Sequence, residues 1–260
     1  MNLPKVRFTA DPEVSALYAS FFLAEPNAFN EYAEKMIFDD HPKLKKILAK
    51  TPKGKKEVET IKDYIREYCK RNEDRIKLAL EEQKSAWNEV GDKVLTTLAS
   101  IFNTDWSDIG ELTWDVGVIQ MYPRDLDKKL FQTYFEQYTF QALPLALHEI
   151  THFIYFKKWK ELFPQDSPDT FEAPHPFWHL SEFMDPIFNT EESLRLLIPD
   201  ANTYHDQMYH SQPFDVNDQS VTIHGYFTQK YLENKRKGKS IEDFLRLARE
   251  KVQKIDFEKL

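Results

Sequence analysis

The chain has 260 residues, of which 41% are hydrophobic and 30% are charged, as expected for a globular protein with a sizeable core. No apolar stretch approaches the ~20 residues of a membrane-spanning helix, and the formal net charge of −8 disfavours a nucleic acid as the main partner. Neither a membrane nor a nucleic-acid partner is therefore expected. The N-terminus lacks an apolar signal segment and Cys69 is the single cysteine, so we expect a cytoplasmic protein. Cys69 lies in a charged helical segment, and no catalytic role is expected for it.

The first 105 residues are predicted to be helical. Only six glycines occur in the chain, and apolar residues recur about every 3.6 positions. One apolar stripe from Val58 to Ile101 predicts a long amphipathic helix, or two helices that break near Gly91. Such a stripe is more often a packing face than a binding groove. Shorter helices are expected before it, at residues 12–24, 27–38 and 42–49.

The sequence pattern changes after Ile101. Residues 103–115 are rich in turn formers, whereas WDVGVIQMYP at 114–123 is rich in β-branched and aromatic residues and resembles a strand. A helix is expected next, at residues 125–138. We therefore expect a boundary near residue 105, between a helical N-terminal region at 1–105 and a second region at 106–260.

The second region is expected to contain a buried helix around the sequence LALHEITHFIY. Proline is tolerated only in the first turn of a helix, so this helix is expected to begin at residues 142–144 and to end near Phe163. Residues 164–176 carry four prolines and predict an irregular connection. The remaining helices are expected from Pro176 with an interruption at Pro186, within 189–199, and as two helices after Asp218. The prediction is an α+β fold that is predominantly helical and has a small sheet.

Three titratable residues interrupt the apolar run of the buried helix. His148 and His152 are four residues apart, so their side chains lie one turn apart on one face, as in a metal chelate. Glu149 points to the side of that face, where a general base can reach a water molecule. Burial of these groups without partners would cost several kcal/mol, and a zinc ion compensates for this cost. The HExxH pattern therefore predicts two zinc ligands and a base.

A catalytic zinc site needs a third protein ligand. Glu182 lies thirty residues after His152, at the start of the next predicted helix, and is the preferred candidate. His179 is the main rival, and His175, between two prolines in a predicted loop, is a weaker one.

With HEITH at 148–152 and a downstream glutamate, the chain resembles the gluzincins, the thermolysin-like zinc metallopeptidases. The resemblance covers residues 142–185. It implies a zincin-like core, hydrolysis of a peptide or protein substrate, and Zn²⁺ as the cofactor. In this family an acidic residue after the ligand glutamate orients a zinc-bound histidine, which implies this role for Asp185. Asp185 is three residues after Glu182, whereas the family has a spacing of four.

Residues 218–232 are similar to the family segment that carries a downstream catalytic histidine. This similarity makes His224 the expected donor to the oxyanion, with Tyr226 as a second candidate. The family also implies that a strand at 116–122 is the edge along which a peptide lies. Four other residues of one segment compete for the donor role, namely Tyr204, His205, Tyr209 and His210.

Two alternatives to a peptidase remain open. Glu149 and His152 also form a Glu-x-x-His pair, as in di-iron carboxylate helical proteins, but the second such pair, Glu172 and His175, contains Pro174. The other alternative is a catalytically silent binding or scaffold protein with a zincin fold. The sequence leaves the substrate and the oligomeric state undetermined.

Overall fold

A computed structural model describes residues 2–255, apart from 138, 190, 200–212 and 217–218. At 139–140, 183–189, 213–216 and 219–220 it describes the backbone and not the side chains. The chain folds into two compact units. The first, called the sheet unit, comprises Pro4–Glu89 and Asp108–Ala146. The second, called the helical unit, comprises Met1–Leu3, Val90–Ser107 and Leu147–Leu260. The boundary near residue 105 that the sequence suggests stays a prediction.

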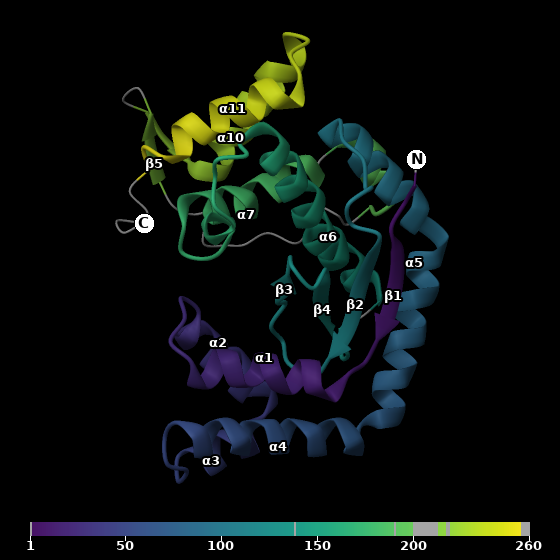
Figure 1. Cartoon of the computed structure of the whole chain (residues 1–260), viewed down its shortest axis with the longest axis vertical. Coiled ribbons are helices and arrows are strands. Elements are labelled where there is room, and N and C mark those ends of the chain that lie inside the picture. Colours follow the sequence, from purple (N-terminus) through teal and green to yellow (C-terminus); the bar gives the residue numbers. More distant parts are fainter. Residues whose placement is uncertain (1, 138, 190, 200–212, 217–218, 256–260) are drawn as a thin grey trace. The chain divides into compact units, whose positions relative to one another are not determined.

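The sheet unit contains a mixed four-stranded sheet with the order β1-β2-β4-β3 (Figure 1). β1, β2 and β4 are parallel, and β3 pairs antiparallel with β4. The central strand β2 is buried over nearly its whole length, as is usual for a strand in a parallel sheet. The strands are β1 (Lys5–Thr9), β2 (Glu111–Gly117), β3 (Arg124–Asp125) and β4 (Leu130–Tyr134).

Side-chain contacts join β2 to β4. The indole Nε1 of Trp114 donates a hydrogen bond to Thr133 Oγ1 at 2.8 Å. A Cβ atom at Gly117 would lie 2.1 Å from Cδ of Gln132, so the glycine leaves the space that the side-chain amide of Gln132 occupies. Gln132 in turn donates to Asp115 Oδ2 at 2.8 Å. A buried polar network therefore lies within the sheet itself.

The helices of the N-terminal part begin and end close to the predicted positions, with one exception. α1 begins after Asp11, whose side chain accepts a hydrogen bond from the backbone N–H of Glu13, and it packs against α2 and α4. The long stripe forms two helices, but they break at Asn72, and Gly91 lies inside α5. The bounds are α1 (Pro12–Ala24), α2 (Asn30–Asp40), α3 (Pro42–Leu48), α4 (Lys55–Arg71) and α5 (Glu73–Phe102).

Two expectations for residues 114–138 are wrong. The expected helix at 125–138 is absent, because residues 130–134 pair with β2 and form β4. The expected strand at 116–122 ends at Gly117, since β2 begins earlier, at Glu111. β2 also lies between β1 and β4, so its main-chain groups are already paired and it offers no edge to a peptide.

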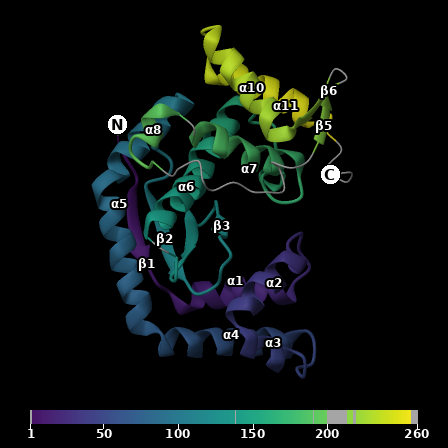
Figure 2. The same ribbon diagram turned by 180° about the vertical axis from the view of Figure 1, so that it is seen from behind.

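The helical unit holds the remaining elements (Figure 2). α7 packs against α10 and α11, and it continues through Pro186, without the expected interruption. The two C-terminal helices separate at Gly238, which has φ +63°, but α10 begins at Ile223, after a hairpin. The elements are α6 (Thr139–Leu162, begun in the sheet unit), η1 (Pro168–Phe171), α7 (Pro176–Asn189), α8 (Glu192–Arg195), β5 (Pro213–Val216), β6 (Gln219–Thr222), α10 (Ile223–Arg236) and α11 (Ile241–Val252).

The fold is thus mostly helical α+β with a small mixed sheet, as the composition and periodicity predict. α6 begins at Thr139, so Pro144 lies inside the helix, just beyond its first turn. None of the helices in the described part of the chain combines the length and the hydrophobicity that crossing a membrane requires.

Candidate metal centre

The centre of the candidate site is the buried helix α6. Apolar residues surround its polar groups on nearly every side, and Ile150, Ile154 and Leu147 are fully buried. His148 is 5% exposed, and His152 is not exposed at all. The helix therefore places two imidazoles in the protein interior, where a polar side chain is stable only with a partner.

The partner is Glu182 of α7, whose carboxylate lies close to both rings. Its Oε2 atom is 3.3 Å from Nε2 of His148, and its Oε1 atom is 3.5 Å from Nε2 of His152. The two Nε2 atoms are 3.1 Å apart. His148, His152 and Glu182 thus form a buried group whose donor atoms can hold one metal ion.

The distances in this group fit tetrahedral coordination. Ligand atoms about 2.1 Å from a tetrahedral zinc ion lie about 3.4 Å from each other. The two Nε2 atoms are 3.1 Å apart, and each lies near a different oxygen of the Glu182 carboxylate, at 3.3 Å and 3.5 Å, so the spacing of the donor groups is close to that value. Two nitrogens and a carboxylate oxygen are also a donor set that zinc accepts. The residues present therefore fit a zinc ion, although the donor set by itself does not identify the metal.

No protein-family model, curated protein or solved structure matches this chain. The buried His-His-Glu group is therefore the observation on which an interpretation of the site depends.

Glu149 is 3% exposed and lies beside this group. Its Oε1 atom is 3.9 Å from Nε2 of His148. This separation places the carboxylate next to the donor atoms without making it one of the three. The role of Glu149 as a base stays a prediction.

The rival ligands have other positions. Among the described His, Cys, Asp and Glu residues, the group that could hold a metal ion contains Glu182 and neither His179 nor His175. His179 is half-buried, and its pKa is lowered to about 4, mainly because burial disfavours the charged imidazolium. His175 lies in the turn before α7, where its Nδ1 accepts a hydrogen bond from the backbone N–H of Phe177 at 3.1 Å.

The second Glu-x-x-His pair has no helical geometry. Glu172 follows the short helix η1, and His175 precedes α7, so neither residue lies on a helix. A di-iron site of helical carboxylate proteins takes its second pair from a helix. The local structure at 172–175 therefore disfavours the di-iron alternative.

The candidate oxyanion donors lie on α10, which packs against α7. His224 is in the first turn, and its Nε2 atom is 3.3 Å from Thr228 Oγ1. Tyr226 is 6% exposed, with Lys230 Nζ 5.7 Å from its ring centre. Their catalytic roles stay predictions.

Several other candidates lie outside the described part of the chain. The backbone of Asp185 belongs to α7, but its side chain is not among those described. Its role in orienting a histidine therefore stays a prediction. The same applies to the remaining donor candidates, which all fall in the segment 200–212, namely Tyr204, His205, Tyr209 and His210.

One contact at the site is not among those expected from the sequence. The ring of Phe156 stacks on the imidazole of His152, with 6.1 Å between ring centres and an angle of 14°. Phe156 is four residues after His152, so helical spacing is the signal that could have found it. This contact restrains the orientation of the imidazole.

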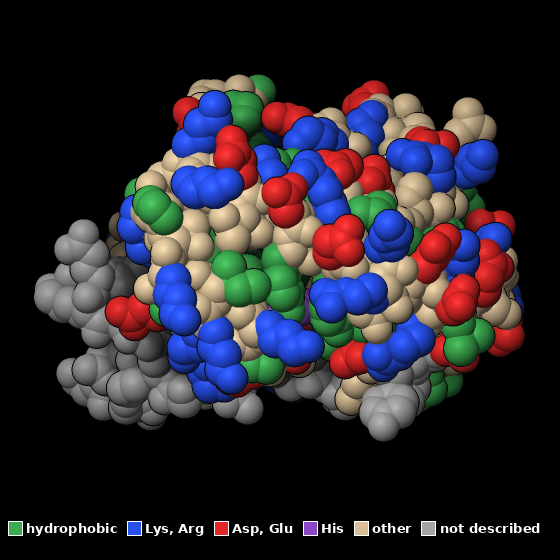
Figure 3. All heavy atoms as spheres, turned by 90° about the horizontal axis from the view of Figure 1, so that it is seen from below, with side chains coloured by type: hydrophobic (Ala, Val, Ile, Leu, Met, Phe, Trp, Pro, Cys, Tyr) green, Lys and Arg blue, Asp and Glu red, His purple; other side chains and the backbone are tan. Residues whose placement is uncertain are grey.

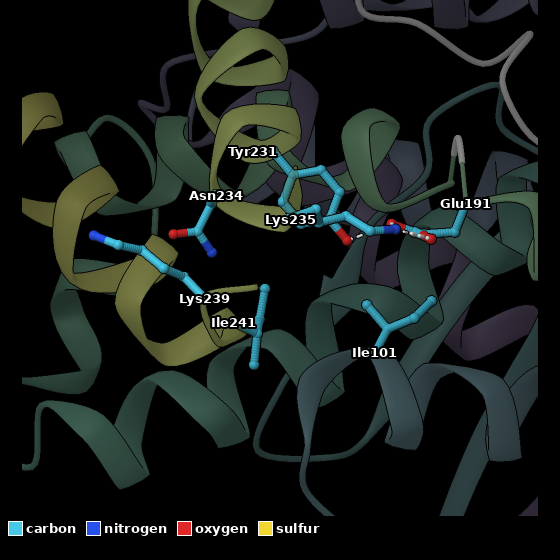
Figure 4. A pocket seen from close by; sticks show the side chains of 7 residues that line it. All are labelled: Ile101, Glu191, Tyr231, Asn234, Lys235, Lys239 and Ile241. Carbon is cyan, nitrogen blue, oxygen red and sulfur yellow. Dashed lines mark hydrogen bonds and ion pairs between the residues drawn. The ribbon is translucent and has the colours of Figure 1, made fainter. Parts of the chain in front are cut away.

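A shallow pocket of about 200 Å³ lies elsewhere in the helical unit (Figure 4). The carboxylate of Glu191, before α8, accepts hydrogen bonds from Tyr231 and Lys235 of α10 in this pocket. The charge of Glu191 is thereby neutralised, and the interaction joins α8 to α10. This pocket contains none of the predicted site residues, and we assign it a structural role.

Proposed function

We propose that the protein is a zinc-dependent metallopeptidase of the gluzincin type. The observation that supports this proposal best is the buried group of His148, His152 and Glu182, with donor atoms 3.1 to 3.5 Å apart. The placement of Glu149 beside this group adds a base to the three candidate ligands. The proposal includes a zincin-like arrangement of the core and a peptide or protein substrate.

His148, His152 and Glu182 would hold the ion, which, when bound, supplies a Lewis acid that polarises a carbonyl group and lowers the pKa of a water molecule. Glu149 accepts the proton of the attacking water and passes it to the leaving amine. The apolar residues of α6 limit access of bulk water to these groups. Such exclusion strengthens each electrostatic interaction within the site.

The remaining roles belong to residues on α7 and α10. In the proposal, His224 or Tyr226 donates a hydrogen bond to the oxyanion of the tetrahedral intermediate, and Asp185 orients one of the histidines by accepting a hydrogen bond from its second ring N–H. The packing of α10 on α7 supports the nearness of these donors to Glu182.

The decisive test is the Glu149→Gln variant, which removes the base and keeps the shape of the side chain. We expect the purified wild-type protein to contain one zinc ion per chain and to cleave members of a fluorogenic peptide library. Glu149→Gln should retain zinc and lose about 10²–10⁴-fold in kcat/KM, the usual contribution of a general base. The matched control, Glu161→Gln, changes an exposed glutamate near the end of the same helix and should cleave like the wild type.

Three outcomes contradict the proposal. Undiminished cleavage by Glu149→Gln would remove Glu149 as the base. Iron in place of zinc, with the absorption band of an oxo-bridged pair, would favour the di-iron alternative. Hydroxamate binding without cleavage of any library member would favour a silent binding protein.

A further inference from the structure

The segment 43–56 of the sheet unit concentrates positive charge. It contains seven of the 35 Lys and Arg residues of the chain and no Asp or Glu. All seven side chains are exposed. We call this set the lysine face, and its members are Lys43, Lys45, Lys46, Lys50, Lys53, Lys55 and Lys56.

The way α3 folds explains why its own three lysines, Lys43, Lys45 and Lys46, face solvent. Leu44 is fully buried and fixes the inner side of α3. The lysines before and after it then point outward, because neighbouring residues of a helix lie on different sides. Figure 3 looks onto the molecule from the side of α3 and α4; Lys and Arg side chains occur over this whole face, and at its lower left few Asp or Glu side chains lie among them.

Most of this charge is not neutralised within the protein. Lys53 pairs with Glu57 at 2.7 Å, and Lys56 lies 3.9 Å from Glu59. Among the described residues, the structure gives no ion pair to the other five lysines. The lysines of the face are thus exposed and make few ion pairs within the protein, although the chain as a whole carries a net charge of −8.

We propose that the lysine face binds the surface of a membrane that contains anionic phospholipids. Clusters of four to eight Lys or Arg residues are typical of such binding, and each lysine near the surface contributes about a factor of five in affinity. Here three of the seven lysines lie on α3, two between α3 and α4, and two in the first turn of α4. Ile47, in the middle of the face, is 43% exposed and supplies an apolar side chain at the level of the headgroups. This is peripheral attachment by charge and does not involve a membrane-spanning segment.

The composition of the face favours lipid over other polyanions. The segment contains no arginine and no aromatic residue, which are the side chains that read bases or stack on them. Lysine is also depleted in protein–protein interfaces, where Tyr, Trp and Arg provide most of the affinity. A set of flexible point charges on one exposed segment matches a fluid layer of headgroups best.

The test is co-sedimentation of the full chain with vesicles of phosphatidylcholine, prepared with and without phosphatidylserine. We expect binding only with phosphatidylserine, and its loss when NaCl rises from about 0.05 M to about 0.5 M, which shortens the screening length about threefold. The triple variant Lys43→Gln, Lys46→Gln and Lys50→Gln should bind about 100-fold more weakly. The matched control replaces three exposed lysines outside the face, Lys93, Lys237 and Lys239, with Gln and should bind like the wild type.

Circular dichroism of both triple variants establishes that they are folded before binding is compared. Equal weakening in the two variants would show that net charge, and not this face, determines binding and would overturn the proposal. Absence of binding to phosphatidylserine vesicles would overturn it as well. Salt-sensitive binding of a DNA or RNA duplex without vesicle binding would replace it with a nucleic-acid interface.

Discussion

His148 and His152 lie one helical turn apart, and their Nε2 atoms converge to 3.1 Å. The four-residue spacing places the two rings on one face of α6 and their side-chain conformations bring the Nε2 atoms together, whereas the third donor depends on which side of α7 faces α6. Glu182 and His179 are three residues apart on α7, so a small rotation of that helix exchanges their positions. The choice between them is therefore a property of packing.

The first prediction at the scale of residues separates these two ligands. Glu182→Ala should lower the affinity for zinc by more than about 100-fold, because it removes a direct donor and not merely a supporting group. His179→Ala, one turn earlier on the same helix, serves as the control and should bind zinc like the wild type. Competition with a chromophoric chelator measures the zinc dissociation constants of both variants. Weak zinc binding by His179→Ala and normal binding by Glu182→Ala would make His179 the ligand.

Asp115 provides the second prediction at this scale. It is fully buried on β2, and burial raises its pKa to about 6 even though it accepts hydrogen bonds from Asp11 N, Thr9 Oγ1 and Gln132 Nε2. Its ordinary pKa is 3.8, so between about pH 4 and pH 6 the folded chain binds more protons than the unfolded chain. The contribution of Asp115 to the free energy of unfolding is therefore full below pH 4 and falls as the pH rises to about 6.

The loss is about 3 kcal/mol, at 1.36 kcal/mol for each pKa unit. Urea unfolding measures the free energy of unfolding of the wild type and of Asp115→Asn from pH 4 to pH 7.5. The difference between the two proteins should change by about 3 kcal/mol over this range. Asp127→Asn, at an exposed position of the same unit, is the control. Parallel stability curves for Asp115→Asn and the wild type would show that this carboxyl does not titrate in the window.

At the scale of elements, α6 is joined to α11 by a buried lysine. Lys158 is 5% exposed, and its Nζ lies 2.6 Å from Glu242 Oε1 and 3.0 Å from the carbonyl oxygen of Asn103. Burial tends to raise the pKa of Glu242, but hydrogen bonds, of which that from Lys158 is the strongest and that from Asn103 the next, together outweigh it, and the pKa is lowered to about 2. The pair therefore holds the C-terminal helix against the helix of the site.

Lys158→Met should lower the free energy of unfolding by about 3 kcal/mol, because it leaves the Glu242 carboxylate without its cation. Lys160→Met, two residues later and exposed, should change it by less than about 0.5 kcal/mol. Adding Glu242→Gln to Lys158→Met should restore part of the loss, since the uncompensated charge is then removed. Urea unfolding measures all three variants, and equal stability of the two single variants would mean that the pair contributes nothing.

At the scale of the whole molecule, metal binding is expected to contribute to stability. The histidines and Glu182 come from positions 148 to 182 and meet only in the folded chain, so the unfolded chain offers no comparable site. A metal at 100 times its Kd then stabilises the folded state by about 2.7 kcal/mol. For a chain of this length, each kcal/mol corresponds to about 2–4 °C in the melting temperature.

Removal of the metal with a chelator should therefore lower Tm by about 5–10 °C, and added zinc should restore it. Differential scanning calorimetry with and without the chelator measures this shift. The Glu182→Ala variant should show little response to either treatment. If the chelator left the Tm of the wild type unchanged, the folded protein would not bind zinc and the prediction would be wrong.

The sequence by itself determined the helices and the centre of the candidate site. The 3.6-residue periodicity acts within a few residues, so α1 and α3, the end of α6 and the break between the two C-terminal helices were predicted closely. The same local regularity placed His148, Glu149 and His152 on one buried helix. Glu182 was the preferred partner from its position in the chain.

Only the tertiary structure decided the sheet and the partners of the site. Residues 130–134 have a spacing compatible with a helix, but pairing with β2 makes them a strand, and β2 itself is paired on both sides. The lysines of 43–56 are visible in the sequence, whereas their exposure is a property of the fold, in which Leu44 is the buried residue of α3. Local sequence determines the geometry of a single helix, but strand pairing, helix rotation and burial arise from contacts between residues far apart in the chain, and these decided the rest.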